Sequence, residues 1–223
     1  MIKNKDIFWK ALVLTVIVFF LGVFLGYLLE RNRLEEFRSE FRKVELEWAD
    51  ARLQSQFFLK IEQGLCEDAI NQNLIFADKI YQEGLKLDKY DASAPLTESS
   101  IEFERTRYAL FKTEFLLNSI ALKEKCNANY TNLIYFFAAN PTDEQIAQQN
   151  VQSEILKEIK NKYGKDIMLI PLPIDLDISV INIFRNSHDI KTVPTVLINE
   201  KVKLAGVQSF ERLEQEISNN DKK

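Results

Sequence analysis

The longest uncharged apolar run of the chain lies within its first thirty residues. Residues 11–29, ALVLTVIVFFLGVFLGYLL, contain no charged side chain. At about 1.5 Å per residue, a helix of this length crosses a hydrocarbon core of about 30 Å. A cleaved signal peptide is the alternative, but the residues after Leu29 offer no small-x-small cleavage site. We therefore expect residues 1–29 to form a short tail and a transmembrane helix, with the lipid bilayer as a partner.

Gly22 and Gly26 lie four residues apart within this run. Such a GxxxG pair lets two membrane helices approach closely, because neither position carries a side chain. A homodimer packed through these two glycines is therefore one expectation. The alternative is that the pair has no packing role, because two glycines four residues apart are common in membrane helices.

A helical period of three and four residues follows the apolar run. Seven of eight positions in this seam are apolar: Leu34, Phe37, Phe41, Val44, Trp48, Ala51, Ser55 and Phe58. The spacing predicts a stalk helix with a heptad seam. A parallel coiled coil is one interpretation. We favour packing against later helices of the same chain, because Phe41 and Trp48 are bulky for a two-stranded seam.

Two further helices are predicted, from about Cys66 to Leu87 and from Ser99 to about Lys125, joined by a loop rich in turn residues. The loop lies midway between Cys66 and Cys126, so an antiparallel hairpin brings both cysteines to the same end. We expect a structural disulfide between them. Two separate thiols and an exchangeable redox pair are the alternatives. Because a lasting disulfide implies an oxidising compartment, the soluble part is expected outside the cell membrane.

From residue 130 the pattern alternates between short apolar runs and helical spacing. Strands are predicted at 133–138, 167–174, 195–198 and 201–204, and helices at 143–163, 178–187 and 209–217. This order predicts an α/β domain over residues 127–217 whose sheet is partly parallel. An all-α stalk and hairpin over 30–126 precede it, and a polar tail, 218–223, follows it.

The order of these strands and helices resembles the thioredoxin fold. Phe136-Phe137-Ala138 ends the first strand, Val193-Pro194-Thr195 opens the third, and Gly206 precedes the last helix. The resemblance implies a cis peptide bond before Pro194 and a peptide-binding loop of Val193, Pro194 and Thr195, where an extended peptide pairs with the Val193 backbone as an added strand. The alternative is that Pro194 only shapes the start of a strand.

The chain departs from that family where the family carries its chemistry. Thioredoxins place Cys-x-x-Cys, with a low-pKa thiolate, between the first strand and the next helix. Here the segment is Ala139-Asn140-Pro141-Thr142, without a cysteine. Asn140 or Thr142 is expected to cap the helix, and the acidic residues at 143 and 144 would disfavour a thiolate. We expect a degenerate active-site loop and no catalytic residue, which leaves an enzymatic role doubtful.

Composition narrows the remaining classes. The net charge of −4 and the pI of about 5.3 argue against a nucleic-acid partner. A single histidine argues against a His-rich metal site or a Ser-His-Asp triad. Asp175 and Asp177 follow a strand, as a carboxylate pair for a metal could, but no further ligand cluster is visible, so we expect helix capping or a solvated loop. No metal and no cofactor are expected.

The leading functional hypothesis is a membrane-anchored, redox-inactive, thioredoxin-like module that binds a protein partner at the outer membrane face. The first alternative is a thiol–disulfide oxidoreductase accessory that uses Cys66 and Cys126 as an exchangeable pair. The second is a self-associating structural stalk.

Overall fold

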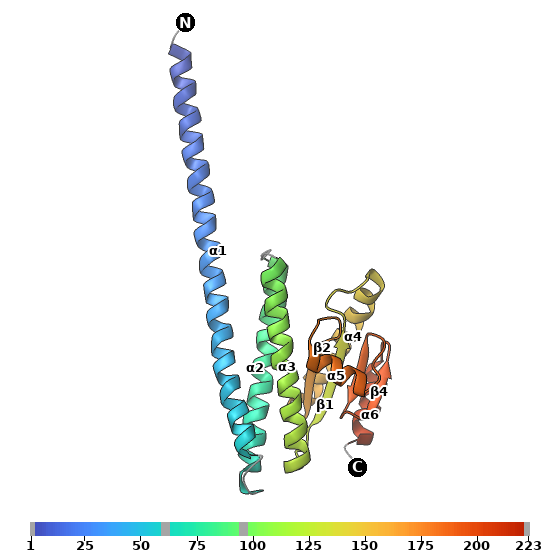
Figure 1. The fold of residues 1–223 in the computed structure, drawn as a ribbon. Helices are drawn as coiled ribbons and strands as arrows, with labels where there is room; N and C mark the ends of the chain where they lie inside the picture. Colours follow the sequence, from blue (N-terminus) through green and yellow to red (C-terminus); the bar gives the residue numbers. More distant parts are fainter. Residues whose placement is uncertain (1–2, 59–62, 94–97, 221–223) are drawn as a thin grey trace. The chain divides into compact units, whose positions relative to one another are not determined.

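The computed structural model describes residues 3–58, 63–93 and 98–220 (Figure 1). The chain divides into two units, residues 1–47 and 48–223. The first unit contains most of helix α1 (Lys3–Phe58). Residues Phe8–Leu29 of this helix have a mean hydropathy of 2.8, and none of them is buried. The segment is thus long and apolar enough to cross a membrane.

Two expectations about α1 stay predictions. A Cβ atom built at Gly22 or Gly26 would meet no atom within 4 Å, so the homodimer packed through these two glycines stays a prediction. The side chains of the seam between Leu34 and Phe58 lie outside those that the structure describes. Beside the seam, Arg52 of α1 forms an ion pair with Glu114, Nε to Oε1 2.7 Å.

The second unit contains a helical hairpin followed by a mixed sheet with its own helices. Its helices are α2 (Cys66–Ser93), α3 (Glu98–Cys126), α4 (Asp143–Tyr163), α5 (Ser179–Ser187) and α6 (Phe210–Asn220), with short 3-10 helices at Gln63–Leu65 and Gly164–Asp166. Its strands are β1 (Thr131–Phe137), β2 (Ile167–Pro173), β3 (Thr195–Ile198) and β4 (Val202–Ala205). Helix α2 ends later than the predicted Leu87, because residues 88–92 contain no glycine or proline.

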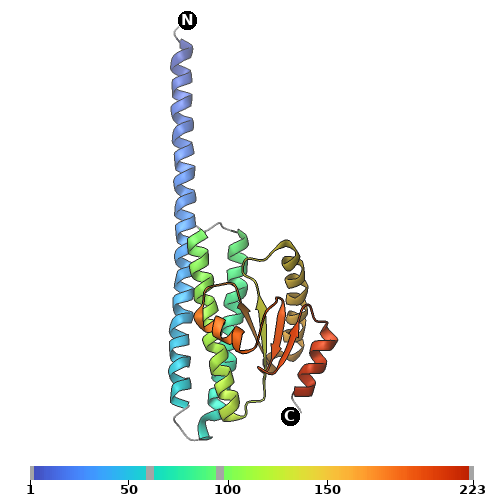
Figure 2. The ribbon, with the colours of Figure 1, turned by 45° about the vertical axis from the view of Figure 1, so that its right-hand side comes forward.

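The strand order is β2-β1-β3-β4, with β1 and β2 parallel and the other pairs antiparallel. Alternate residues of β1 face opposite sides of the sheet. Ile134 and Phe136 pack in the cluster that includes residues of α2, α3 and α5, whereas Leu133 and Tyr135 pack with α4 and α6. The sheet is therefore covered by helices on both faces (Figure 2). This is why every residue of β1 but the last is buried.

The helical hairpin shares its hydrophobic core with the sheet. Phe76 and Phe115, whose ring centroids are 5.9 Å apart, belong to the same buried cluster as Phe136 of β1 and Met168 of β2. The hairpin of the predicted segment 30–126 and the sheet of the predicted segment 127–217 thus share one core, although they differ in sequence pattern.

A disulfide closes the hairpin at the predicted pair. Cys66 and Cys126 are bonded, with their Cα atoms 5.4 Å apart and a sequence separation of 60. In the chain-entropy view, closing a loop of this length stabilises the fold by on the order of 4 kcal/mol. The bond fixes the start of α2 to the end of α3, immediately before the chain enters β1.

A buried polar cluster joins the hairpin to the sheet at this same end. We call Ser119, Lys123, Asn132, Asn199 and Glu200 the Asn132 cluster. Ser119 Oγ donates to Asn132 Oδ1 at 2.7 Å, and Asn132 Nδ2 donates to Glu200 Oε1 at 3.1 Å. Lys123 Nζ donates to Asn199 Oδ1 at 2.7 Å, and so does the Asn132 amide, at 2.9 Å. The cluster connects α3, β1 and the turn after β3 through charged and neutral hydrogen bonds.

The turn between β3 and β4 is held in place by this cluster. Asn199 and Glu200 both have positive φ, 47° and 56°, and Lys201 N donates to Ile198 O at 3.0 Å, the pattern of a type I′ turn. Glutamate is unfavourable in this conformation, where Asn or Gly is preferred. The hydrogen bond from Asn132 to the Glu200 side chain helps to stabilise glutamate in this backbone conformation.

The effect of the buried Glu200 carboxylate on the stability of the fold can be tested. Burial raises its pKa, and the hydrogen bond from Asn132 and the charge of Lys123 oppose that shift only in part. A raised pKa in the folded state means that stability is complete below the ordinary Glu value and falls as the pH rises through the raised value. We predict that Glu200→Gln gives the full-length protein in detergent a higher urea midpoint than the parent at pH 7.5, with the difference shrinking at pH 4. Near-UV circular dichroism of the tyrosines measures both midpoints.

Glu158→Gln, at an exposed position on α4, is the matched control. Its midpoint should follow that of the parent at both pH values. A Glu200→Gln variant less stable than the parent at pH 7.5 would show that attraction to Lys123 outweighs the cost of burial.

Candidate functional site

Three loops meet at one end of the sheet because of its register. Phe137 of β1 pairs with Pro173 of β2, and Phe136 pairs with Thr195, the first residue of β3. The segment after β1, the segment after β2 and the residues before β3 therefore lie together. We call this the loop end of the sheet. The degenerate active-site loop predicted from the sequence, residues 140–142, lies at this end. So do residues 193–195, which we call the proline loop.

The segment after β1 is closed by an aspartate from the segment after β2. The backbone amides of Ala139 and Asn140 donate to Asp175 Oδ1 at 2.6 Å and Oδ2 at 2.8 Å. Both carboxylate oxygens are thus engaged by neighbouring amides. The sequence predicts helix capping or a solvated loop for Asp175, whereas its carboxylate binds two amides of the segment after β1.

Helix α4 begins with a capping box. Thr142 is the N-cap, and its Oγ1 accepts from the amide of Gln145 at 3.4 Å. Gln145 Oε1 accepts in return from the amide of Thr142 at 2.9 Å. Of the two caps considered from the sequence, Asn140 and Thr142, the N-cap is Thr142. Asp143 and Glu144 occupy the first turn, where negative charge favours the positive end of the helix.

Gln149 of α4 binds the backbone of Ala138 through its side chain. No pattern in the sequence indicates this role. Its Oε1 accepts from the amide of Ala138, and its Nε2 donates to the carbonyl of Ala138 at 3.4 Å. Its side chain is buried, which is unusual for glutamine unless its polar atoms are satisfied. Gln149 therefore fixes the direction in which the chain leaves β1.

The proline loop lies on the other side of the loop end. The Val193–Pro194 peptide bond is cis. The carbonyl of Pro194 accepts from the amide of Gly206 at 2.8 Å, and Thr195 Oγ1 donates to the carbonyl of Thr192 at 2.7 Å. Pro194 and Thr195 are buried, whereas Val193 is only half-buried. The peptide-binding role expected for these three residues stays a prediction.

The two cysteines lie far from this loop end. Cys126 precedes the start of β1, and the degenerate loop follows its end, so the seven-residue strand separates them. At about 3.3 Å per residue, that separation is about 20 Å. The disulfide therefore cannot take the place of a Cys-x-x-Cys pair at the loop end.

The loop end brings together backbone amides, a carboxylate and a phenol. The loop itself contains no cysteine, and its amides are directed at a carboxylate. Next to the loop, burial raises the pKa of Tyr135 to about 12, so this side chain is a neutral phenol at physiological pH. Among the described residues, no group of three or more His, Cys, Asp or Glu side chains could hold a metal ion.

Solved structures similar to this chain include two thioredoxins. One is chloroplastic thioredoxin z, with 14% sequence identity and a TM-score of 0.38, covering 49% of this chain and 90% of the other. Another is thioredoxin-2, described as a component of malaria parasite protein secretion machinery, with 22% identity and a TM-score of 0.34, covering 42% and 90%. A third is described as a malarial protein, with 23% identity and a TM-score of 0.32, covering 41% and 97%.

No family model and no curated protein sequence matches the chain. All three structures have TM-scores below 0.5. The description of the fold therefore rests on the strand order and register of this chain. The C-terminal part of the chain is a mixed α/β sheet of four strands with thioredoxin-like structural neighbours.

Proposed function

We propose that this chain is a membrane-anchored, thioredoxin-like binding module whose loop end holds an extended segment of a protein partner without dithiol chemistry. The observation that carries the proposal is the pair of hydrogen bonds from the amides of Ala139 and Asn140 to Asp175. They place a carboxylate against the loop where the family has a thiolate. At the same end, Val193 is half-buried and precedes the cis bond to Pro194.

Extended peptides are held at such a position by backbone pairing, with side-chain pockets adding specificity. The apolar helix Phe8–Leu29 would keep this module at a membrane. The disulfide supports placing it in an oxidising compartment, outside the cell membrane. A redox accessory using Cys66 and Cys126 is the second candidate, because that pair is oxidised and both residues are partly accessible.

The binding proposal predicts a partner contact at the proline loop. A photo-crosslinking amino acid at Thr192, an exposed position, should give a discrete adduct in native membranes. The same probe at Lys165 is the matched control, because this exposed residue precedes β2 at the opposite end of the sheet. The Thr192 adduct should persist under reducing conditions, since no mixed disulfide is involved.

Equal adducts from both positions, or none from Thr192, would contradict the binding proposal. An adduct that forms only when Cys66 and Cys126 are intact and is lost on reduction would favour the redox accessory instead.

The electrostatic part of the proposal is tested by placing a thiol in the loop. We predict that the thiol of Ala139→Cys has a pKa above the usual value near 8.5, because Asp175 repels a thiolate there. The thiol should therefore react slowly with iodoacetamide. Adding Asp175→Asn should lower that pKa by about one unit and speed alkylation severalfold at pH 7. The pH profile of iodoacetamide labelling, followed by mass spectrometry without reduction, measures it.

Asp177→Asn is the matched control, since Asp177 is an exposed carboxylate two residues along the same segment. It should leave the labelling profile of Ala139→Cys unchanged. If neither aspartate variant moves the profile, or both move it equally, Asp175 has no specific influence on the loop.

A further inference from the structure

A short segment, residues 127–130, joins the end of α3 to the start of β1. Ala128 and Tyr130 are buried, whereas Asn127 and Asn129 are exposed. The side chains of this segment therefore alternate between the core and the solvent, and the Asn129 amide group is on the solvent side. At such a position an amide can carry a bulky polar substituent without a change in the packing of the core.

Asn129 is the first residue of an acceptor pattern for N-linked sugars. Asn129-Tyr130-Thr131 fits Asn-x-Thr, in which x is any residue except proline. The sequence has the same spacing at one other place, Asn140-Pro141-Thr142, where the proline excludes it. Asn140 is exposed as well. The sequence therefore contains one usable acceptor and one exposed asparagine that serves as its internal control.

The order of the strands determines when this pattern is accessible. Thr131, its third residue, is 1% exposed in the finished fold and pairs with Ile167 of β2. Strand β1 lies between β2 and β3, both of which follow it in the chain. Residues 129–131 therefore have no strand to pair with until those later segments are available. In that interval the whole acceptor pattern is open to a modifying enzyme.

Contacts of Tyr130 with α3 keep the neighbouring Asn129 outside the core once the chain has folded. Tyr130 Oη donates to the carbonyl of Ser119 at 2.7 Å. Lys123 Nζ donates to the carbonyl of Tyr130 at 2.6 Å. The side chain and the backbone of Tyr130 are thus both held against the hairpin. A substituent on the Asn129 amide is compatible with these contacts, because the Asn129 side chain takes no part in them.

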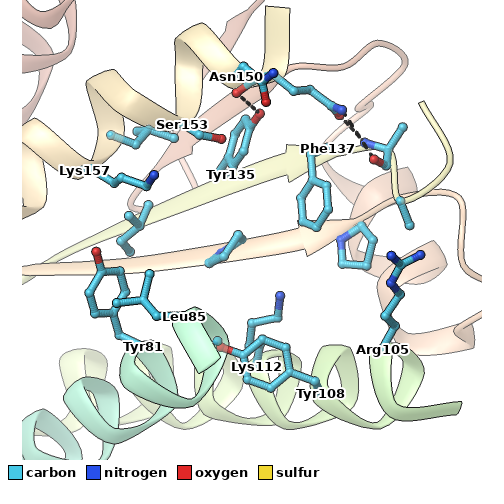
Figure 3. A pocket seen from close by; sticks show the side chains of 18 of the residues that line it. Tyr81, Leu85, Arg105, Tyr108, Lys112, Tyr135, Phe137, Asn150, Ser153 and Lys157 are labelled. Carbon is cyan, nitrogen blue, oxygen red and sulfur yellow. Dashed lines mark hydrogen bonds between the residues drawn. The ribbon is translucent and has the colours of Figure 1, made fainter. Parts of the chain in front are cut away.

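A sugar on Asn129 would leave the loop end unobstructed. The loop end lies at the other end of the seven-residue strand β1, at a distance of about 20 Å. A cavity of about 530 Å³ between α4 and the α2–α3 hairpin is lined by Tyr135 and Phe137, from the later half of β1, and by Ala139 of the loop (Figure 3). The proposed peptide contact at Val193 and this cavity are therefore both remote from the acceptor.

We propose that Asn129 carries an N-linked sugar on the outer side of the cell membrane. The donor is a lipid-linked oligosaccharide, whose first sugar is joined through C1 to a polyprenyl phosphate, and a membrane transferase of the host catalyses the transfer. Asn129 Nδ2 forms a bond to C1 and loses one proton. The bond between C1 and the phosphate oxygen breaks, and the lipid phosphate leaves with its electron pair. The inference goes beyond the binding role but rests on the proposed placement of this unit outside the membrane.

Glycopeptide mass spectrometry of the full-length protein, purified in detergent from its own membranes, tests the proposal. Fragmentation should place the mass of an oligosaccharide on Asn129 and leave Asn140 unmodified. Asn129→Gln should lose this mass completely. Thr131→Ser, which keeps a hydroxyl at the third position, should retain it. Asn127→Gln, at another exposed asparagine of the same segment, is the matched control and should be modified like the parent.

Translation of the full chain in the presence of endoplasmic-reticulum microsomes, which supply a transferase and its donor, measures the orientation separately. Pro141→Ala turns Asn140 into a second acceptor of the same unit. The parent should gain one endoglycosidase-sensitive sugar, and Pro141→Ala should gain two.

A sugar at Asn140 of Pro141→Ala without one at Asn129 would overturn the proposal and leave the outside placement intact. So would a sugar at Asn129 in microsomes together with an unmodified protein in native membranes. No sugar on either chain, in microsomes and in native membranes alike, would contradict the outside placement and the proposal with it.

Discussion

The hydrogen bonds around Asn132 are the constraint on which the second unit of this protein depends. Asn132 is fully buried in the inner strand β1, so its polar groups must be satisfied inside the protein. Ser119 of α3 and Glu200 of the β3–β4 turn satisfy its side chain, and Asn199 accepts from its backbone. Leaving any of these groups unpaired would cost about 1–3 kcal/mol. The hairpin, the sheet and the turn are thus fixed by one set of requirements.

That arrangement also determines what the loop end can do. Because β1 is fixed at its start by the cluster and the disulfide, its end has a defined place beside Pro173 and Thr195. The aspartate that follows β2 then reaches the amides that follow β1. The same strand pairing places β2 at the sheet edge, where the hairpin and α4 enclose the cavity. The positions of the loop end and of the cavity therefore follow from the register of β1 and from what anchors its first residues.

Much of the fold could be predicted from local patterns, and the site could be predicted only in part. Apolar spacing located the strands and most helix boundaries, since burial on both faces leaves a continuous apolar run in β1. The Cys66–Cys126 disulfide could be predicted because the two residues are equally distant in sequence from the loop of the hairpin. Gln149 could not be found in this way, because a buried polar side chain has the same sequence pattern as an exposed one. The role of Asp175 depends on a contact 36 residues distant in sequence, which no local pattern contains.

The central claim is that the hairpin and the sheet form one cooperative unit that holds the loop end in position. Native-state hydrogen exchange of the full-length protein tests it most directly, by comparing buried amides of α3, such as Leu116, with those of β1, such as Ile134. The account predicts that the most protected amides of both elements open with the same free energy, within about 1 kcal/mol, and that both shift together with denaturant. Opening of β1 at a free energy several kcal/mol below that of α3 would contradict it.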